Sequence, residues 1–207
     1  MSGLFYFLVF NALTFVFQTK KWNIMRKIIV SAWVSIDGVF DADTMPQWFF
    51  PFDSIERQQY ITKGIMECDT ILLGRTTYEM LASFWPYQTN DDMGPASKLN
   101  SVKKYVISSR LKKAEWNNTT IISENIVEEI AKLKRQKGSE IQIEGSATLV
   151  QSLMKDNLID EFRFLVHPII AGNGKRFFKD GMNTNELKLV KTQTLDKGII
   201  ALYYQTT

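Results

Sequence analysis

Glycine, hydroxyl and arginine side chains follow one apolar segment in an order that suits phosphate binding. Residues 72–79 read LLGRTTYE, so Gly74 ends the apolar segment and a helix is predicted to start at Thr76 or Thr77. Glycine lets a ligand approach the backbone closely, the free N–H groups of a helix N-terminus favour anions, and the guanidinium of Arg75 suits phosphate. A capped helix beside a solvated arginine gives the same pattern, so spacing alone does not separate these two interpretations.

Two later turns repeat this chemistry after other apolar segments. Ser108, Ser109 and Arg110 could hydrogen-bond the ribose 2′-phosphate that distinguishes NADPH from NADH. Residues 143–149, IEGSATL, place a glycine and small side chains at a helix N-terminus, which suits a pyrophosphate. A polar turn or a tight connection would explain either segment alone, and neither matches G-x-G-x-x-G or the Walker pattern. The three turns together therefore indicate a phosphorylated cofactor more strongly than any one of them.

Alternating strands and helices would place these turns at one edge of a sheet. The periodicity predicts strands over residues 27–36, 69–73, 105–108, 119–123, 140–144, 160–167, 187–194 and 199–205. It predicts helices over residues 53–67, 76–85, 126–136 and 146–155, and a surface loop over residues 86–100. Helical connections make the sheet mostly parallel, and a closing hairpin makes it mixed. Ligands then bind beyond the carboxyl ends of the strands, where the three turns lie.

Composition excludes several other classes of protein. The 207 residues are 45% hydrophobic and 23% charged, which is typical of one globular domain. The single cysteine, Cys68, cannot form an internal disulfide framework, and we expect a buried thiol. The single histidine, His167, is expected to be structural, and no metal site is expected. A net charge of +3 is too small to indicate nucleic-acid binding.

The first 24 residues differ from the rest of the chain. The apolar run LFYFLVFNALTFVF spans residues 4–17, which is shorter than the roughly 20 residues needed to cross a bilayer. No lysine or arginine precedes this run, and no A-x-A-like cleavage site follows it, as a signal peptide would require. We therefore expect residues 1–24 to be an apolar leader or start-site extension, and residues 25–207 to be one folded, cytoplasmic domain without stable membrane association. A membrane anchor is the alternative.

Several segments match, in order, the motifs of a known family. They are SIDG at residues 35–38, GRTTYE at 74–79, SSR at 108–110, GSATL at 145–149, DEF at 160–162 and PIIAGNGKRFF at 168–178. With these motifs the chain resembles the dihydrofolate-reductase-like superfamily, most closely the reductase domain of the bifunctional riboflavin-biosynthesis deaminase/reductase. The zinc-deaminase signature H-x-E…P-C-x-x-C does not occur, so the chain resembles a stand-alone reductase domain.

The resemblance implies a three-layer αβα sandwich around the mixed sheet, NADPH as hydride donor, a small-molecule substrate and often a homodimer. It also implies that the first and third turns contact cofactor phosphates and that the serine-rich turn contacts the adenosine end. In this family the first strand runs beside the nicotinamide. The cofactor-binding residues implied in this way are Ala32, Trp33, Gly74, Arg75, Thr76, Ser108, Ser109, Arg110, Gly145, Ser146, Ala147, Thr148 and Leu149.

Hydride transfer to a C=N or C=O bond leaves an atom that needs a proton, and a buried carboxyl with a raised pKa can supply it. Residues 47–53, QWFFPFD, resemble the W-x-x-P-x-D segment of true dihydrofolate reductases. That match would make Asp53 catalytic and Trp48 a wall of the substrate pocket, whereas the alternative is that Asp53 only caps the next helix. Asp37 is a second candidate for substrate binding, although an Asp-Gly turn explains it nearly as well.

The function implied by the resemblance is NADPH-dependent reduction of a pyrimidine- or pterin-like substrate, most like that of 5-amino-6-(5-phosphoribosylamino)uracil reductase of riboflavin biosynthesis. Two alternatives stay open. One is dihydrofolate reductase, which rests on Trp48, Pro51 and Asp53. The other is a noncatalytic, dimeric nucleotide-binding relative. If Asp53 handles the proton, replacing it by asparagine should sharply lower turnover.

Overall fold

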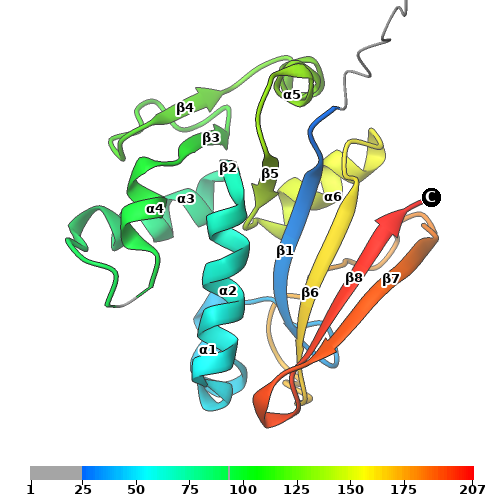
Figure 1. Ribbon diagram of the computed structural model, residues 1–207. Helices are drawn as coiled ribbons and strands as arrows, with labels where there is room; N and C mark the ends of the chain where they lie inside the picture. Colours follow the sequence, from blue (N-terminus) through cyan, green and yellow to red (C-terminus); the bar gives the residue numbers. More distant parts are fainter. Residues whose placement is uncertain (1–24, 93) are drawn as a thin grey trace, which may run out of the picture.

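One sheet of eight strands, in the order β4-β3-β2-β5-β1-β6-β8-β7, organises the molecule (Figure 1). The computed structural model describes residues 25–92 and 94–207, so the expected leader over residues 1–24 lies outside the described residues. The strands from β4 to β6 are parallel, whereas β8 runs antiparallel to β6 and β7. The predicted mixed, mostly parallel sheet with a closing hairpin is confirmed. The strands are β1 (Ile28–Ser35), β2 (Cys68–Gly74), β3 (Lys103–Ile107), β4 (Thr119–Ile122), β5 (Glu140–Ile143), β6 (Glu161–His167), β7 (Leu187–Thr194) and β8 (Ile200–Thr206).

Helices pack on both faces of the sheet and produce three layers (Figure 1). The helices are α1 (Met45–Trp48), α2 (Ile55–Glu67), α3 (Arg75–Ala82), α4 (Ala96–Ser101), α5 (Ile126–Arg135) and α6 (Ala147–Lys155). Apolar side chains of α2, α3 and α4 pack against β2 and β3 on one face, and those of α5 and α6 pack on the other. In the described part of the chain, none of these helices is both long and apolar enough to cross a membrane.

The central strand β1 decides which side chains reach which face. Successive side chains of a strand point to opposite sides of the sheet. Ile28 and Val30 belong to the core beneath α5 and α6, whereas Trp33 packs with residues of α2 on the other side. Because β5 and β6 pair with β1 on both sides, the strand is almost entirely buried. The side chains of Ser31 and Trp33 are therefore the part of β1 that borders space on the α2 face.

The predicted loop over residues 86–100 contains a helix, which is a correction. α4 begins at Ala96, and a one-turn 3-10 helix forms at Trp85–Tyr87, after α3 has ended at Ala82 rather than at the predicted Trp85. Leu99 is 3% exposed and packs beside α2 and α3. The polar composition of this stretch predicted a loop, but burial of a few apolar side chains stabilises the helix, as tertiary packing generally does for short helices.

Candidate active site

The first and third predicted turns lie side by side at the carboxyl edge of the sheet. β2 and β5 are parallel neighbours, and the backbone N–H of Gly74 donates to the carbonyl of Gly145 over 2.9 Å. A Cβ on Gly74 would lie 2.5 Å from the Oγ of Ser146, so a larger residue would force the two turns apart. Since α3 and α6 begin directly after these turns, their N-termini open at the same place.

A cavity of about 670 Å³ lies at these two helix N-termini. This volume is in the range of small-molecule binding sites. The cavity is lined by six of the residues that the sequence predicted for cofactor or substrate binding. They are Trp33, Trp48, Thr76, Ser146, Ala147 and Thr148.

The two helix N-termini differ in how their backbone N–H groups are satisfied. α6 is capped by the Oγ of Ser146, which accepts from the N–H of Leu149 at 3.4 Å. In the described structure, α3 begins after Gly74 without a side-chain cap, so its first N–H groups can bind an anion. Arg75 forms two short hydrogen bonds with the carboxylate of Glu79, one turn along α3. Its guanidinium is therefore held along the helix and does not line the cavity.

Glu144 contributes a carboxyl group to the cavity and was missed in the sequence. It follows the last residue of β5 and directly precedes Gly145, and its side chain is partly buried at the cavity wall. Burial raises the pKa of Glu144 from 4.5 to about 7, although a hydrogen bond from the amide of Gln142 acts in the opposite direction. The sequence did contain one sign of this residue: a carboxyl group stands at the end of an apolar strand, next to a predicted ligand-binding turn. The sequence gives no measure of its burial.

The segment after β6 supplies a basic wall to the cavity. Its backbone joins the loop after β1, because the N–H of Phe40 donates to the carbonyl of Lys175 over 2.8 Å. Lys175, Arg176 and Lys179 line the cavity from this segment. The Nζ of Lys175 lies 3.1 Å from a carboxylate oxygen of Asp41, and this contact contributes to the lowered pKa of Asp41, against the opposing effect of burial. The rim therefore carries both charges.

Two predicted cofactor residues lie in the core rather than at the cavity. Ala32 is 2% exposed and Leu149 is 6% exposed, and both belong to the core beneath α5 and α6. Ala32 faces this core because it neighbours Trp33 on a strand, where adjacent side chains point to opposite faces. Neither residue lines the cavity.

The serine-rich turn lies outside the cavity. Ser108 follows β3, one strand beyond β2 at the same edge of the sheet. Its Oγ accepts from the backbone N–H groups of Arg110 and Leu111, at 3.1 and 3.0 Å, and so stabilises the turn. The side chains of Ser109 and Arg110 are exposed. In this structure the segment has the geometry of the polar turn that was the alternative interpretation.

Asp53 does not have the surroundings predicted for a proton donor. The residue is exposed and does not line the cavity. One carboxylate oxygen lies 2.6 Å from Arg57, and both oxygens accept from Gln58. The pKa of Asp53 is lowered despite the opposing effect of desolvation, because these hydrogen bonds and the charge of Arg57 favour the ionised form. The N-cap of α2 is Ser54, whose Oγ accepts from the N–H of Arg57, so Asp53 does not cap this helix either.

Asp37 stabilises a turn rather than the cavity. Its carboxylate accepts from the Oγ of Ser35 at 2.6 Å and from the backbone N–H groups of Ala171 and Gly172, both at 2.9 Å. These hydrogen bonds, with that from Ser35 the largest, lower the pKa of Asp37 to about 2. The side chain therefore joins the loop after β1 to the segment after β6. This place agrees with the alternative interpretation, in which Asp37 belongs to an Asp-Gly turn.

The aromatic cluster before α2 surrounds the only histidine of the chain. Trp48 is 1% exposed, and the ring of Phe49 stacks on Trp33 at 4.7 Å. His167 is fully buried against these rings, and its Nδ1 lies 3.2 Å from the carbonyl of Val34. Burial lowers the pKa of His167 to about 4. His167 is thus a structural histidine, as expected, and Trp48 and Trp33 form an aromatic wall of the cavity.

The sheet order, the three layers and the cavity at the carboxyl edge define a protein with a dihydrofolate-reductase-like fold. Dihydrofolate reductase from Enterococcus faecalis, complexed with NADP(H), has a TM-score of 0.59 at 16% identity, covering 87% of this chain and 96% of that chain. A diaminohydroxyphosphoribosylaminopyrimidine deaminase/5-amino-6-(5-phosphoribosylamino)uracil reductase from Thermotoga maritima has a TM-score of 0.62 at 12% identity, covering 88% of this chain and 57% of that chain. At these identities the likeness shows the fold alone.

The chain belongs to the RibD C-terminal domain family, which it matches over residues 26–201. The uncharacterized protein YyaP of Bacillus subtilis (strain 168) is 31% identical over 184 residues, covering 86% of this chain and 94% of that protein. The family resemblance seen in the sequence is therefore confirmed.

Proposed function

We propose that this protein is a reductase that binds NADPH at the carboxyl edge of its sheet and reduces a pyrimidine-like heterocycle in the same cavity. One observation carries the proposal: the same cavity contains two helix N-termini and a carboxyl group with a pKa of about 7. Helix N-termini suit the phosphates of a dinucleotide, and such a carboxyl suits proton transfer near neutral pH. Membership of the RibD C-terminal domain family supports an oxidoreductase.

The residues at the cavity fit NADPH. The close contact between Gly74 and Ser146 holds the two turns together, so the N-termini of α3 and α6 lie beside the same cavity. The uncapped N–H groups of α3 and the hydroxyls of Thr76 and Thr148 would hold phosphate oxygens. When bound, the reduced nicotinamide supplies a hydride.

Glu144 would handle the proton that accompanies hydride transfer. With a pKa of about 7, its carboxyl is protonated in about half of the molecules at neutral pH, so it can both donate a proton and regain it. Trp33 and Trp48 border the same cavity. The same walls would hold a flat heterocycle beside Glu144.

The rim of the cavity favours an acidic or phosphate-bearing substrate. Among the basic residues there, Lys175 is paired with Asp41 and Asp43, and Arg176 with Asp37. Lys179 lines the cavity without an ion pair in the described structure, so its charge is available to a phosphate. The Thermotoga maritima protein is named as a reductase of a phosphoribosylaminouracil. That name supports the same class of substrate here.

Two measurements test the proposed function. Titration with NADPH should quench tryptophan fluorescence through Trp33 and Trp48, more strongly than titration with NADH does. Adding 5-amino-6-(5-phosphoribosylamino)uracil should then consume NADPH, with dihydrofolate as the comparison substrate. Absence of binding at about millimolar NADPH would refute the proposal. Binding of NADPH without turnover of either substrate would instead favour a noncatalytic nucleotide-binding protein.

The variant that tests the chemistry is Glu144→Gln. It should lower turnover by about 100-fold or more, which is the usual contribution of general acid catalysis, while NADPH binding is retained. Asp53→Asn is the matched control, because Asp53 lies outside the cavity, and its turnover should match that of the unchanged protein. Loss of turnover in Asp53→Asn with normal turnover in Glu144→Gln would return the catalytic role to Asp53.

A further inference from the structure

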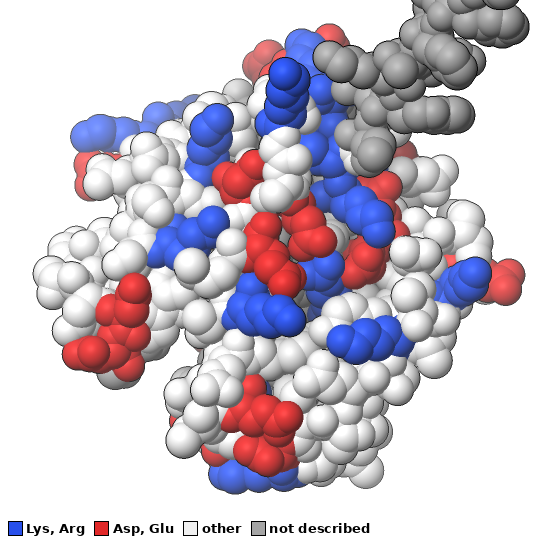
Figure 2. Space-filling view, in the orientation of Figure 1, with Lys and Arg blue, Asp and Glu red and all other residues white. Residues whose placement is uncertain are grey.

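A second cavity, of about 360 Å³, lies beside α2 and over β6, β7 and β8. It shares Ser31 and Trp33 with the larger cavity, so the two lie next to each other on the same face of the sheet. Its wall is part polar and part apolar, and its charged residues include Lys63, Arg163 and Lys191. Figure 2 shows acidic and basic side chains gathered on this face of the molecule.

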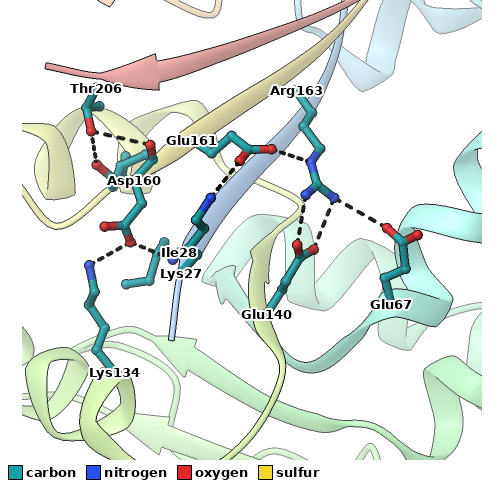
Figure 3. Close-up of polar contacts among 10 residues, drawn as sticks. Lys27, Ile28, Glu67, Lys134, Glu140, Asp160, Glu161, Arg163 and Thr206 are labelled. Atoms are coloured by element: carbon teal, nitrogen blue, oxygen red, sulfur yellow. Dashed lines mark hydrogen bonds and ion pairs between the residues drawn. The ribbon is translucent and has the colours of Figure 1, made fainter. Parts of the chain in front are cut away.

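The guanidinium of Arg163, the most central charge of the second cavity, is already paired. Its Nε donates to Glu161 over 2.7 Å, and its other nitrogens lie 2.9 Å from Glu140 and 3.7 Å from Glu67 (Figure 3). Burial acts to lower the pKa of Arg163, but Glu140 and Glu161 outweigh it and raise this pKa. Because acidic groups surround it, Arg163 is not arranged as a site for an anionic ligand. The function of this cavity must therefore come from another of its side chains.

Gln142 connects the two cavities. It lies in β5 between β1 and β2, is 2% exposed and lines the second cavity. Its Nε2 donates a hydrogen bond to the Oε1 of Glu144, which lines the larger cavity. Among the described residues, its Oε1 is buried without a hydrogen-bond partner. A buried amide oxygen needs a donor, and the second cavity is where a water molecule can supply one.

We propose that Gln142 is a positioning residue that holds the Glu144 carboxyl toward the larger cavity, while water in the second cavity hydrates the other end of its amide. The hydrogen bond restricts the carboxyl to one orientation and stabilises its ionised form. Among the described residues, the Gln142 amide is the one donor to the Glu144 carboxyl, so without it no protein group would fix the orientation of this carboxyl. Its catalytic consequence rests on the proposed function, whereas the contact itself does not.

Burial and the Gln142 amide are the two causes that set the pKa of Glu144. Other charged and titratable groups line the two cavities, and Cys68 on β2 is close enough for the charge of Glu144 to influence its pKa. The groups that line the cavities are Asp41 and Asp43 after β1, Glu56, Tyr60, Lys63 and Glu67 on α2, Arg163 on β6, Lys175, Arg176 and Lys179 after β6, Lys191 on β7 and Tyr203 on β8. A shift caused by Gln142 must therefore be measured on Glu144 directly rather than on overall activity.

Nuclear magnetic resonance of the labelled full-length protein provides that measurement. The carboxyl carbon of Glu144 is titrated with pH, while the side-chain amide signals of Gln142 and Gln151 are followed in the same sample. Gln151 is the internal control, because it is also buried but donates to the carbonyl of Phe177 over 2.6 Å. We expect the Gln142 amide to move with the midpoint of Glu144 while the Gln151 amide does not. A Gln142 amide that ignores this titration would overturn the proposal.

The variant Gln142→Met keeps the length of the side chain and removes the donor. Its Glu144 midpoint should rise by about one pH unit, the size expected for one hydrogen bond to a charged group, whereas Gln151→Met should leave that midpoint unchanged. An unchanged Glu144 midpoint in Gln142→Met would count against the proposal. If this variant does not fold, the titration of the unchanged protein still tests the proposal. If the contact is observed but NADPH is not consumed, the proposed function fails and the role of Gln142 stands. If NADPH is consumed but the contact between Gln142 and Glu144 is not observed, the proposed function stands and the role of Gln142 fails.

Discussion

Replacing Glu144 by glutamine should change how the stability of the protein depends on pH. The pKa of Glu144 is raised from 4.5 to about 7 in the folded protein, with burial as the largest cause. Between these two values the folded state binds a proton that the unfolded state has lost. The free energy of unfolding therefore falls as pH rises through this range, because the folded protein must then bury a charge. Glu144→Gln has no such charge and should lose this pH dependence.

The structure sets the size of this effect. The difference between 4.5 and about 7 corresponds to about 3 kcal/mol. The side chain is only partly buried and faces a cavity that water can enter, so part of this penalty is relieved by solvent. We therefore expect Glu144→Gln to gain about 1–3 kcal/mol relative to the unchanged protein between about pH 5 and about pH 9.

Urea unfolding of both proteins at these two pH values measures this gain. Asp53→Asn is the control, since the lowered pKa of the exposed Asp53 places its titration below this range. Its effect on stability should be the same at both pH values. If the difference between Glu144→Gln and the unchanged protein is also independent of pH, Glu144 titrates as an ordinary carboxyl, and the basis for its catalytic role is removed.

Three further predictions follow from single side chains. Gly74→Ala should weaken NADPH binding and lower stability, because its Cβ would lie 2.5 Å from a neighbouring hydroxyl. Gly64→Ala is the control, because Gly64 lies inside α2 and the atom nearest to its added Cβ would be 4.0 Å away. This variant should gain up to about 1 kcal/mol of helix stability, and equal losses of stability in both variants would contradict this reasoning. Burial lowers the pKa of His167 from 6.5 to about 4, so its contribution to stability should be lost as pH falls through this range, and urea unfolding of His167→Gln should show a weaker acid dependence. Steady-state assays of Asp53→Asn should show unchanged turnover, and a sharp loss would support the assignment drawn from the W-x-x-P-x-D resemblance.

The sequence by itself determined the alternation of elements and the places where ligand-binding turns occur. Apolar segments separated by amphipathic helices have few stable arrangements, and a mostly parallel sheet between helix layers is one of them. Gly74 and Gly145 could be singled out because a glycine at the end of an apolar strand allows a tight turn or close approach to the backbone. The parallel sheet then brings these two turns to one edge, where the N–H of Gly74 meets the carbonyl of Gly145.

Only the tertiary structure distinguished the surroundings of the two acidic side chains. Asp53 and Glu144 are both carboxylic acids beside apolar residues in the sequence. In the fold, Asp53 is exposed beside Arg57, which favours its ionised form. Glu144 is partly buried at the wall of the larger cavity, and burial raises its pKa. A pKa depends on the desolvation and charges that surround a group in three dimensions. Sequence order does not contain these quantities, and for that reason the motif pointed to Asp53 while the structure favours Glu144.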